Sequence, residues 1–134
     1  MIISHIYADE HGESHFADLE LPESIMPSAP GLPDMLSTAS MGATSLRLIS
    51  TKPEAMASGW HPAPARQFSL MLKGSVAVEV SDGEIRQFGS GSVRFFEDTW
   101  GKGHLNHAID TDDILLGFVA LPDRTIVIDG KIAR

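Results

Sequence analysis

The stretch over residues 76–88 restricts the fold of this chain more than any other part of the sequence. Valine stands at every second position from residue 76 to residue 80, and this two-residue period is typical of a β-strand with one buried face. The pair Asp82-Gly83 follows, and a second extended run occupies residues 85–88. An Asp-Gly pair between two such runs predicts a tight β-hairpin, because its turn needs positive φ angles. We therefore expect antiparallel strands.

The same signals recur over most of the chain. Glycine and proline are spread along it, no long helical period stands out, and turn residues such as Gly89-Ser90-Gly91 separate the extended runs. Many short strands between such turns predict an all-β fold, either a barrel or a double-sheet jelly roll. Beyond the hairpin, strands are predicted over residues 46–49, 60–72, 93–97, 104–108, 114–121 and 125–128.

The first 45 residues carry weaker signals. Apolar residues on both sides of a polar break predict two short strands within residues 1–21. Residues 22–45 then contain prolines at positions 22, 27, 30 and 33. Proline removes backbone donors and interrupts regular ladders, so this segment is predicted to be a loop that lies over the body of the domain. Long loops of this kind are often functional or packed as a lid.

Length, charge and composition exclude several classes of protein. The length of 134 residues suits one domain with one hydrophobic core. The net charge of −8 disfavours binding to nucleic-acid phosphates and to anionic lipid. The amino terminus does not resemble a secretory signal, and no apolar run reaches the length of a membrane span. We therefore expect a cytoplasmic protein with neither a nucleic-acid nor a membrane partner.

Residues 59–74 carry the first group of candidate functional side chains. If they form one extended strand, His61, Gln67 and Ser69 share one face, because side chains alternate between the faces of a strand. That face is small and polar, as the lining of a pocket should be. The opposite face is apolar from Phe68 to Leu72 and needs a cover, which a second sheet or a second subunit would provide.

The loop before His104 carries the second group. Gly101 and Gly103 stand on either side of a lysine directly before this histidine. Glycine permits close backbone approach and unusual dihedral angles, and a histidine that leaves such a loop at a strand start can point into the mouth of a barrel. Three further side chains flank the two histidines and either line the pocket mouth or pack at its rim: Trp60, Trp100 and Lys102.

These two segments together resemble the motifs of the cupin superfamily. The first cupin motif is His-x-His followed by a glutamate and then a glycine, and the chain has His61, Ala63, Gln67 and Gly74 at these places. The second motif is matched by Thr99-x-Gly101-x-x-His104, with threonine where proline is usual.

The resemblance covers residues 59–121 and has consequences for the fold. It implies one cupin-type domain over residues 1–134, a double-stranded β-helix or jelly-roll barrel. In this reading residues 1–45 supply N-terminal strands and the proline-rich loop, and residues 46–128 form the barrel core.

The resemblance also implies a metal site, with a reduced set of ligands. Metal-binding cupins typically use three histidines and one glutamate, and the matching positions here leave His61, Gln67 and His104, since Ala63 has no ligand atom. Two imidazoles and an amide can hold Zn, Mn, Fe or Ni with water in the open positions, although an amide stabilises a cation less than a carboxylate does. The chain has no cysteine to add. His107 is predicted to face away from His104, three positions earlier.

Three functions are compatible with these residues. The first is a metal-dependent enzyme acting on a small organic molecule, with oxygenase, isomerase, lyase or cyclase chemistry; a metal-free variant would use His61 or His104 as the general acid or base. The second is a non-catalytic or metal-free protein that binds a small ligand. The third, a structural subunit with a filled barrel, is disfavoured by the polar side chains on the inner face.

A homodimer is expected under all three functions. The apolar face at Phe68, Leu70 and Leu72 needs a cover, and the cupin resemblance implies pairing by packed sheets or exchanged strands. The proline-rich segment before Leu46 is the candidate for crossing to the partner.

Overall fold

The computed structural model describes residues 1–57, 59–122, 126–128 and 131–133. Strands account for 51% of the chain and helix for 3%, so the prediction of an all-β protein is confirmed. Among the described residues, no helix has the length and apolar character needed to cross a membrane.

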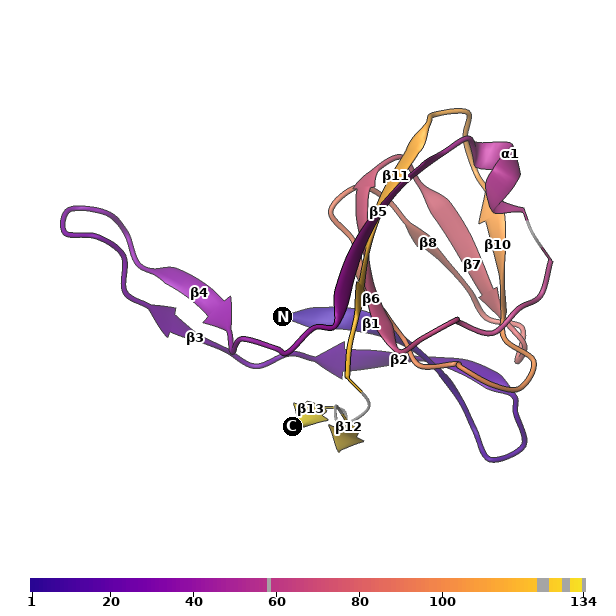
Figure 1. The fold of residues 1–134 in the computed structure, drawn as a ribbon, viewed down its shortest axis with the longest axis horizontal. Helices are drawn as coiled ribbons and strands as arrows, with labels where there is room; N and C mark the ends of the chain where they lie inside the picture. Colours follow the sequence, from indigo (N-terminus) through magenta and orange to yellow (C-terminus); the bar gives the residue numbers. More distant parts are fainter. Residues whose placement is uncertain (58, 123–125, 129–130, 134) are drawn as a thin grey trace.

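Two sheets form the body of the molecule, and a separate hairpin projects from it (Figure 1). The large sheet has the strand order β12-β13-β2-β1-β9-β6-β11-β5, and the small sheet has the order β10-β7-β8. Within the described ranges these sheets do not join into one closed barrel. The elements are β1 (Ile2–Ala8), β2 (Ser14–Glu20), β3 (Glu23–Met26), β4 (Met35–Thr38), β5 (Ser45–Thr51), α1 (Pro53–Met56), β6 (Gln67–Lys73), β7 (Val76–Val80), β8 (Ile85–Phe88), β9 (Val93–Phe96), β10 (His104–Ala108), β11 (Ile114–Ala120), β12 (Ile126–Ile128) and β13 (Lys131–Ala133).

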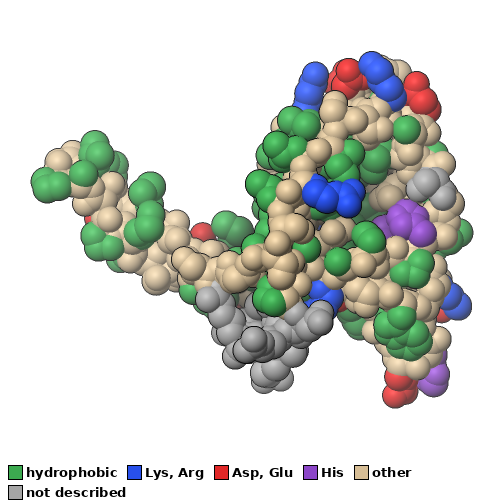
Figure 2. Space-filling model, viewed as in Figure 1, with side chains coloured by type: hydrophobic (Ala, Val, Ile, Leu, Met, Phe, Trp, Pro, Cys, Tyr) green, Lys and Arg blue, Asp and Glu red, His purple; other side chains and the backbone are tan. Residues whose placement is uncertain are grey.

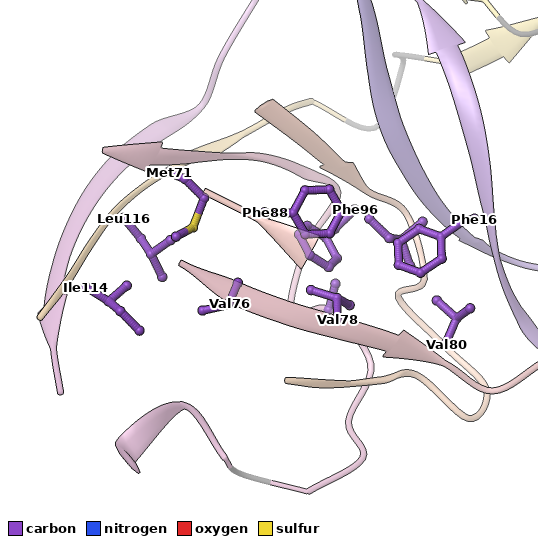
Figure 3. Packing of buried hydrophobic residues seen from close by; sticks show 11 residues of the cluster. Phe16, Met71, Val76, Val78, Val80, Phe88, Phe96, Ile114 and Leu116 are labelled. Atoms are coloured by element: carbon purple, nitrogen blue, oxygen red, sulfur yellow. The ribbon is translucent and has the colours of Figure 1, made fainter. Parts of the chain in front are cut away.

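The main hydrophobic core lies between the two sheets (Figure 3). Val76, Val78 and Val80 of β7 are fully buried, on the face that the two-residue period predicted. They face side chains of the large sheet such as Met71 and Leu116. Burial of a side chain of this size contributes about 1.5–3 kcal/mol, and a slip of one residue would turn all three valines to the other face. The core therefore fixes the register of β7.

The predicted hairpin is confirmed, and it positions a candidate site residue. β7 and β8 pair antiparallel, with Val76 opposite Phe88. On its other edge β7 pairs with β10, with Val80 opposite His104. Because the register of β7 is fixed by the core, the position of His104 at the start of β10 is fixed too.

The strand predicted over residues 60–72 is shorter than expected, because β6 begins only at Gln67. Pro62 and Pro64 have no backbone N–H to donate to a ladder, and His61 before them forms an isolated bridge with His104 instead. From Gln67 onward the predicted alternation holds, and the side chains of Gln67 and Ser69 are buried.

The interpretation of residues 1–45 was right for its first half and wrong for its second. The two strands predicted within residues 1–21 are β1 and β2, which pair in the large sheet, where β1 also pairs parallel with β9. Residues 22–45 are not a loop over the body, because β3 and β4 form an antiparallel hairpin that points away from it (Figure 1). The prolines of this segment lie outside the two strands, so they do not interrupt the ladder between Glu23 and Thr38. We call residues 23–38 the arm.

The outer face of the large sheet carries a second apolar cluster. Phe68 and Phe95 are buried there, with ring centroids 5.1 Å apart. The cluster continues into a groove of about 420 Å³ bordered by residues of the segment 37–43 at the base of the arm. Leu46 and Leu48 of the edge strand β5 are exposed by 63% and 66%. The apolar face predicted around Phe68 is therefore only partly covered by its own chain.

A charged link joins the turn between β1 and β2 to the turn between β7 and β8. The imidazole of His15 lies with Nε2 2.7 Å from Asp9 Oδ2 and Nδ1 2.8 Å from Asp82 Oδ2. The hydrogen bonds to Asp9 and to Asp82 raise the pKa of His15. Next to it, the hydroxyl of Ser14 donates to the carbonyl oxygen of Gly103 at 2.6 Å. Through this hydrogen bond, the start of β2 supports the loop that leads to His104.

The end of the chain adds one strand that the sequence did not predict, β13 (Lys131–Ala133), which pairs with β12 and with β2. The predicted strand over residues 125–128 corresponds to β12. Residue 125 at its start, and the Asp129-Gly130 turn expected at its end, lie outside the described residues.

Candidate functional site

A pocket of about 340 Å³ opens between the two sheets. Its lining brings together His61, Gln67 and His104, which the sequence assigned to one site although they are up to 43 positions apart. The lining comes from β5, α1, the segment before β6, and strands β6, β9, β10 and β11. It consists of Arg47, Met56, His61, Pro62, Ala63, Pro64, Gln67, Arg94, Phe96, His104, Asn106, Leu116 and Phe118.

The two histidines are held together by their backbones. The N–H of His61 donates to the carbonyl of His104 and the N–H of His104 donates to the carbonyl of His61, both at 3.0 Å. The ring centroids are 4.7 Å apart. The approach depends on Gly103, which has φ +73° and whose position leaves no room for a Cβ, since that atom would lie 2.2 Å from the His61 carbonyl. The prediction that glycine here permits close backbone approach is confirmed.

Each histidine has one ring nitrogen bound to an acceptor. Nδ1 of His61 lies 2.9 Å from the carbonyl oxygen of Gly59. Nδ1 of His104 lies 2.6 Å from Oδ2 of Asp98, a fully buried carboxylate. Because a carbonyl or an ionised carboxylate can only accept, Nδ1 carries the hydrogen in both rings. The lone pair of each neutral ring is then on Nε2.

Asp98 was not predicted as a site residue, and it holds the ring of His104 through Nδ1. Its side chain has 0% exposure, and its Oδ1 has no hydrogen-bond partner. Its backbone carbonyl accepts from the N–H of Ala63 at 2.9 Å, which ties the loop before β10 to the segment that follows His61. Asp98 therefore orients the ring of His104 and joins the two halves of the site.

The four residues proposed for the rest of the pocket lie outside its lining. Ser69 is fully buried and accepts a hydrogen bond from Arg94. Lys102 turns outward and pairs with Glu13. The two tryptophans, Trp60 and Trp100, are about half exposed, at 47% and 52%. The reasons differ: Trp60 is adjacent to His61 on an extended segment and so points to the opposite side, whereas Ser69 and Lys102 are engaged by Arg94 and Glu13.

Three polar residues of the lining were missed, and two of them had a signal in the sequence. Asn106 stands two positions after His104 and therefore on the same face of β10. Arg94 stands two positions before Phe96 on β9, opposite Ser69 on β6. Arg47 is brought to the pocket by β5, and nothing local in the sequence indicated it.

His107 was predicted to face away from His104, and it does not line the pocket. Its Nε2 lies 2.9 Å from Oε2 of Glu79 on the neighbouring strand β7. The side chain is 43% exposed.

The donors of the pocket fit a metal ion in one respect and not in another. A ligating histidine usually donates its other ring N–H to a carbonyl or carboxylate, and His61 and His104 both do. The set of ligands is small, because no group of three or more His, Cys, Asp or Glu side chains suited to a metal occurs in the described residues. Two guanidinium groups, Arg47 and Arg94, line the same pocket and repel a cation. The described lining thus combines two imidazoles with two guanidinium groups.

No protein-family model and no curated protein sequence matches this chain.

Proposed function

We propose that the pocket binds a small organic molecule and that His104, oriented by Asp98, transfers a proton to and from it. The observation that carries this proposal is the buried 2.6 Å pair between Asp98 Oδ2 and His104 Nδ1 on a pocket wall. A carboxylate on one side of an imidazole fixes its tautomer and stabilises the imidazolium that forms when the other nitrogen takes a proton. Pairs of this kind serve as general acid–base groups.

The Asp98–His104 pair can remove a proton and later return it, and this capacity defines the proposed reaction. Nε2 of His104 removes a proton from a carbon next to a carbonyl group of the substrate, and the electron pair of that C–H bond moves into the carbonyl as an enolate. When the substrate has a β,γ double bond, the enolate is conjugated with it and the imidazolium returns the proton to the γ-carbon, which is an isomerisation. When the β-carbon carries a leaving group, the enolate expels it with cleavage of that bond, which is a lyase reaction. His61, with its ring centroid 4.7 Å from that of His104, offers the lone pair of Nε2 as an acceptor for a hydroxyl group of the substrate.

We also propose that the two sheets are a variant of the cupin-type jelly roll, and two observations support this. Residues from both resembling motifs, His61, Gln67 and His104, line one pocket. The main core lies between two facing sheets, as the core of a jelly roll would.

A metal-dependent enzyme is the second candidate, favoured by the Nδ1 contacts of His61 and His104. In that case His61, His104 and Gln67 would hold Zn, Mn, Fe or Ni, and the ion would act as a Lewis acid on a substrate carbonyl. The absence of a carboxylate from the lining is the reason it stands second. A protein that binds the same molecule without reaction is the third.

Proton transfer is tested by deuterium exchange. The protein is incubated in D₂O with a panel of small oxo acids and ketones, and the loss of C–H signals is followed by NMR. We expect exchange with the wild type, and a rate on the order of 10²–10⁴ lower for His104→Asn. His107→Asn, on the same strand but outside the pocket, is the matched control and should keep the wild-type rate.

The same samples separate the three candidates. Exchange that His104→Asn leaves unchanged would contradict the proton-transfer proposal. Stoichiometric metal, measured by plasma mass spectrometry and lost in both His61→Asn and His104→Asn, would support the second candidate. Binding of panel members without any exchange would support the third.

We further propose that the chain is a homodimer in which the arm of each copy packs on the other copy. Every residue of β3 is exposed, and the arm carries mostly apolar side chains (Figure 2). An isolated two-stranded hairpin is at best marginally stable in water, so the arm needs a surface to pack on. The partly open apolar groove at Leu70 and Val119 lies at the base of the same arm. A twofold axis would bring each arm to the groove of the other copy.

Replacement of the apolar arm side chains should dissociate this dimer. Ile25 and Leu36 face each other across the arm and are each 67% exposed, so their replacement by glutamate does not disturb the body. Sedimentation velocity should give twice the chain mass of 14.5 kDa for the wild type and the single mass for the double variant. Ile85→Glu, at a position 54% exposed on the small sheet, should remain dimeric. A wild type that sediments as a monomer at all concentrations would disprove the arrangement.

A further inference from the structure

Arg94 is a buried cation without an anionic partner among the residues that the structure describes. Its side chain is only 2% exposed, and it lines the pocket that holds the two histidines. No acidic side chain in the described part of the chain forms an ion pair with it, and its Nε has no hydrogen-bond partner. Burial of a charge is costly unless the charge is paired and hydrogen-bonded. A buried arginine of this kind therefore needs an explanation.

The contacts that Arg94 does make hold it without neutralising it. Its Nη2 donates to the hydroxyl of Ser69 at 2.6 Å and lies 3.3 Å from the sulfur of Met71. Its guanidinium carbon lies 5.0 Å from the ring centroid of Phe88 and 5.3 Å from that of Phe96. Each of these contacts is worth far less than an ion pair with a carboxylate in a dry site. They orient the guanidinium and leave its positive charge free to bind an anion.

The ring of Phe96 relates Arg94 to the proposed acid–base group. The guanidinium carbon of Arg94 lies 5.3 Å from the centroid of this ring, and the ring centroid of His104 lies 4.7 Å from the same point. Arg94 and His104 therefore pack against one aromatic side chain of the pocket lining. Arg47, which is exposed on β5, adds a second positive charge to the lining.

We propose that the pocket takes an organic anion, a small carboxylic acid whose carboxylate is bound by Arg94. This inference rests on the proposed function, because it names the class of molecule that the pocket binds. Arginine presents parallel N–H donors that match the two oxygens of a carboxylate. Bound there, the carboxylate supplies the missing negative charge and directs the neighbouring carbons of the molecule towards His104. Entry of the anion also removes the penalty of the unpaired cation, so binding stabilises the fold.

The test measures binding and does not depend on turnover. Propionate, pyruvate, malonate and succinate are each compared with the corresponding neutral amide by thermal shift and titration calorimetry on the wild-type protein. We expect at least one carboxylate to raise the melting temperature and its amide to have no effect. Arg94→Met should weaken binding of that carboxylate at least about thirtyfold, the lower range for loss of one partner of a buried charged pair.

Three further variants make the result specific. Methionine replaces the buried guanidinium by an apolar side chain of similar length, so Arg94→Met should fold, and Arg94→Lys retains the charge in the event that it does not. Arg86→Met is the matched control, because Arg86 pairs with Asp18 and Glu84 outside the pocket and its loss should not change the affinity for carboxylates. His104→Asn should still bind the carboxylate, since the proton-transfer group is not the anion-binding group.

Each outcome decides between the two proposals. A carboxylate that binds the wild type and His104→Asn but not Arg94→Met supports the anion site, whatever the exchange experiment shows. Amides that bind as tightly as carboxylates, or a carboxylate that binds Arg94→Met as tightly as the wild type, would overturn the anion site and leave the pocket intact. A panel in which neither carboxylates nor amides bind would overturn both.

Discussion

Replacing Gly103 by alanine is expected to lower the free energy of unfolding by about 3 kcal/mol or more and to separate the two histidines of the pocket. Two costs combine at this position. A left-handed backbone costs a residue with a Cβ about 1–2 kcal/mol, and Gly103 has φ +73°. The new Cβ would also lie 2.2 Å from the carbonyl carbon and oxygen of His61 and 2.4 Å from the nitrogen of Pro62. These are backbone atoms, so no side chain can move aside, and the bridge between His61 and His104 must open.

Chemical denaturation checks the first effect, and NMR of the histidine rings checks the second. Gly91→Ala is the matched control, because Gly91 has φ +88° and a Cβ there would meet nothing within 4 Å. It should lose only the backbone term of about 1–2 kcal/mol. Equal destabilisation of the two variants would show that the contact between Gly103 and His61 is not as close as described.

The second large effect is expected at Asp98. Replacement by asparagine keeps the size of the side chain but removes the negative charge beside His104 Nδ1. The imidazolium that forms when His104 takes a proton then loses the carboxylate that stabilises it. We expect the rate of proton exchange to fall by a factor on the order of 10²–10⁴, while the fold is retained because an amide can still accept from Nδ1.

Asp98→Asn has a close control in the same chain. Glu97 is the neighbouring residue and also pairs with a histidine, with Oε1 2.7 Å from His5 Nε2, but neither residue lines the pocket. Glu97→Gln should therefore leave the exchange rate unchanged, although it weakens the pairs with His5 and Arg66. If the exchange rate responds equally to both substitutions, the effect is one of general stability and the role assigned to Asp98 is incorrect.

Local patterns in the sequence were sufficient to predict those strands in which inward-facing and outward-facing side chains alternate strictly. The hairpin at residues 76–88 was predicted because burial on one face leaves a two-residue period and the turn requires Asp-Gly. The same alternation placed Gln67 on an inner face. His61 and His104 were grouped through a resemblance of motifs, and the structure brings both into one pocket.

The sequence by itself thus determined that this chain forms antiparallel β-structure, which strand faces are buried, and that glycine is needed before His104. These are local properties, set by the period of side chains along a strand and by the allowed φ angles of each residue. The tertiary structure alone decided what surrounds the histidines. Asp98 reaches His104 across a loop, and within the described ranges the strands around Arg94 bring no carboxylate to its guanidinium. The arm can form a hairpin because its prolines lie outside its ladder, and it points away from the body (Figure 1). The pairing that brings Arg94 opposite Ser69 joins strands distant in sequence, and no local pattern records such contacts.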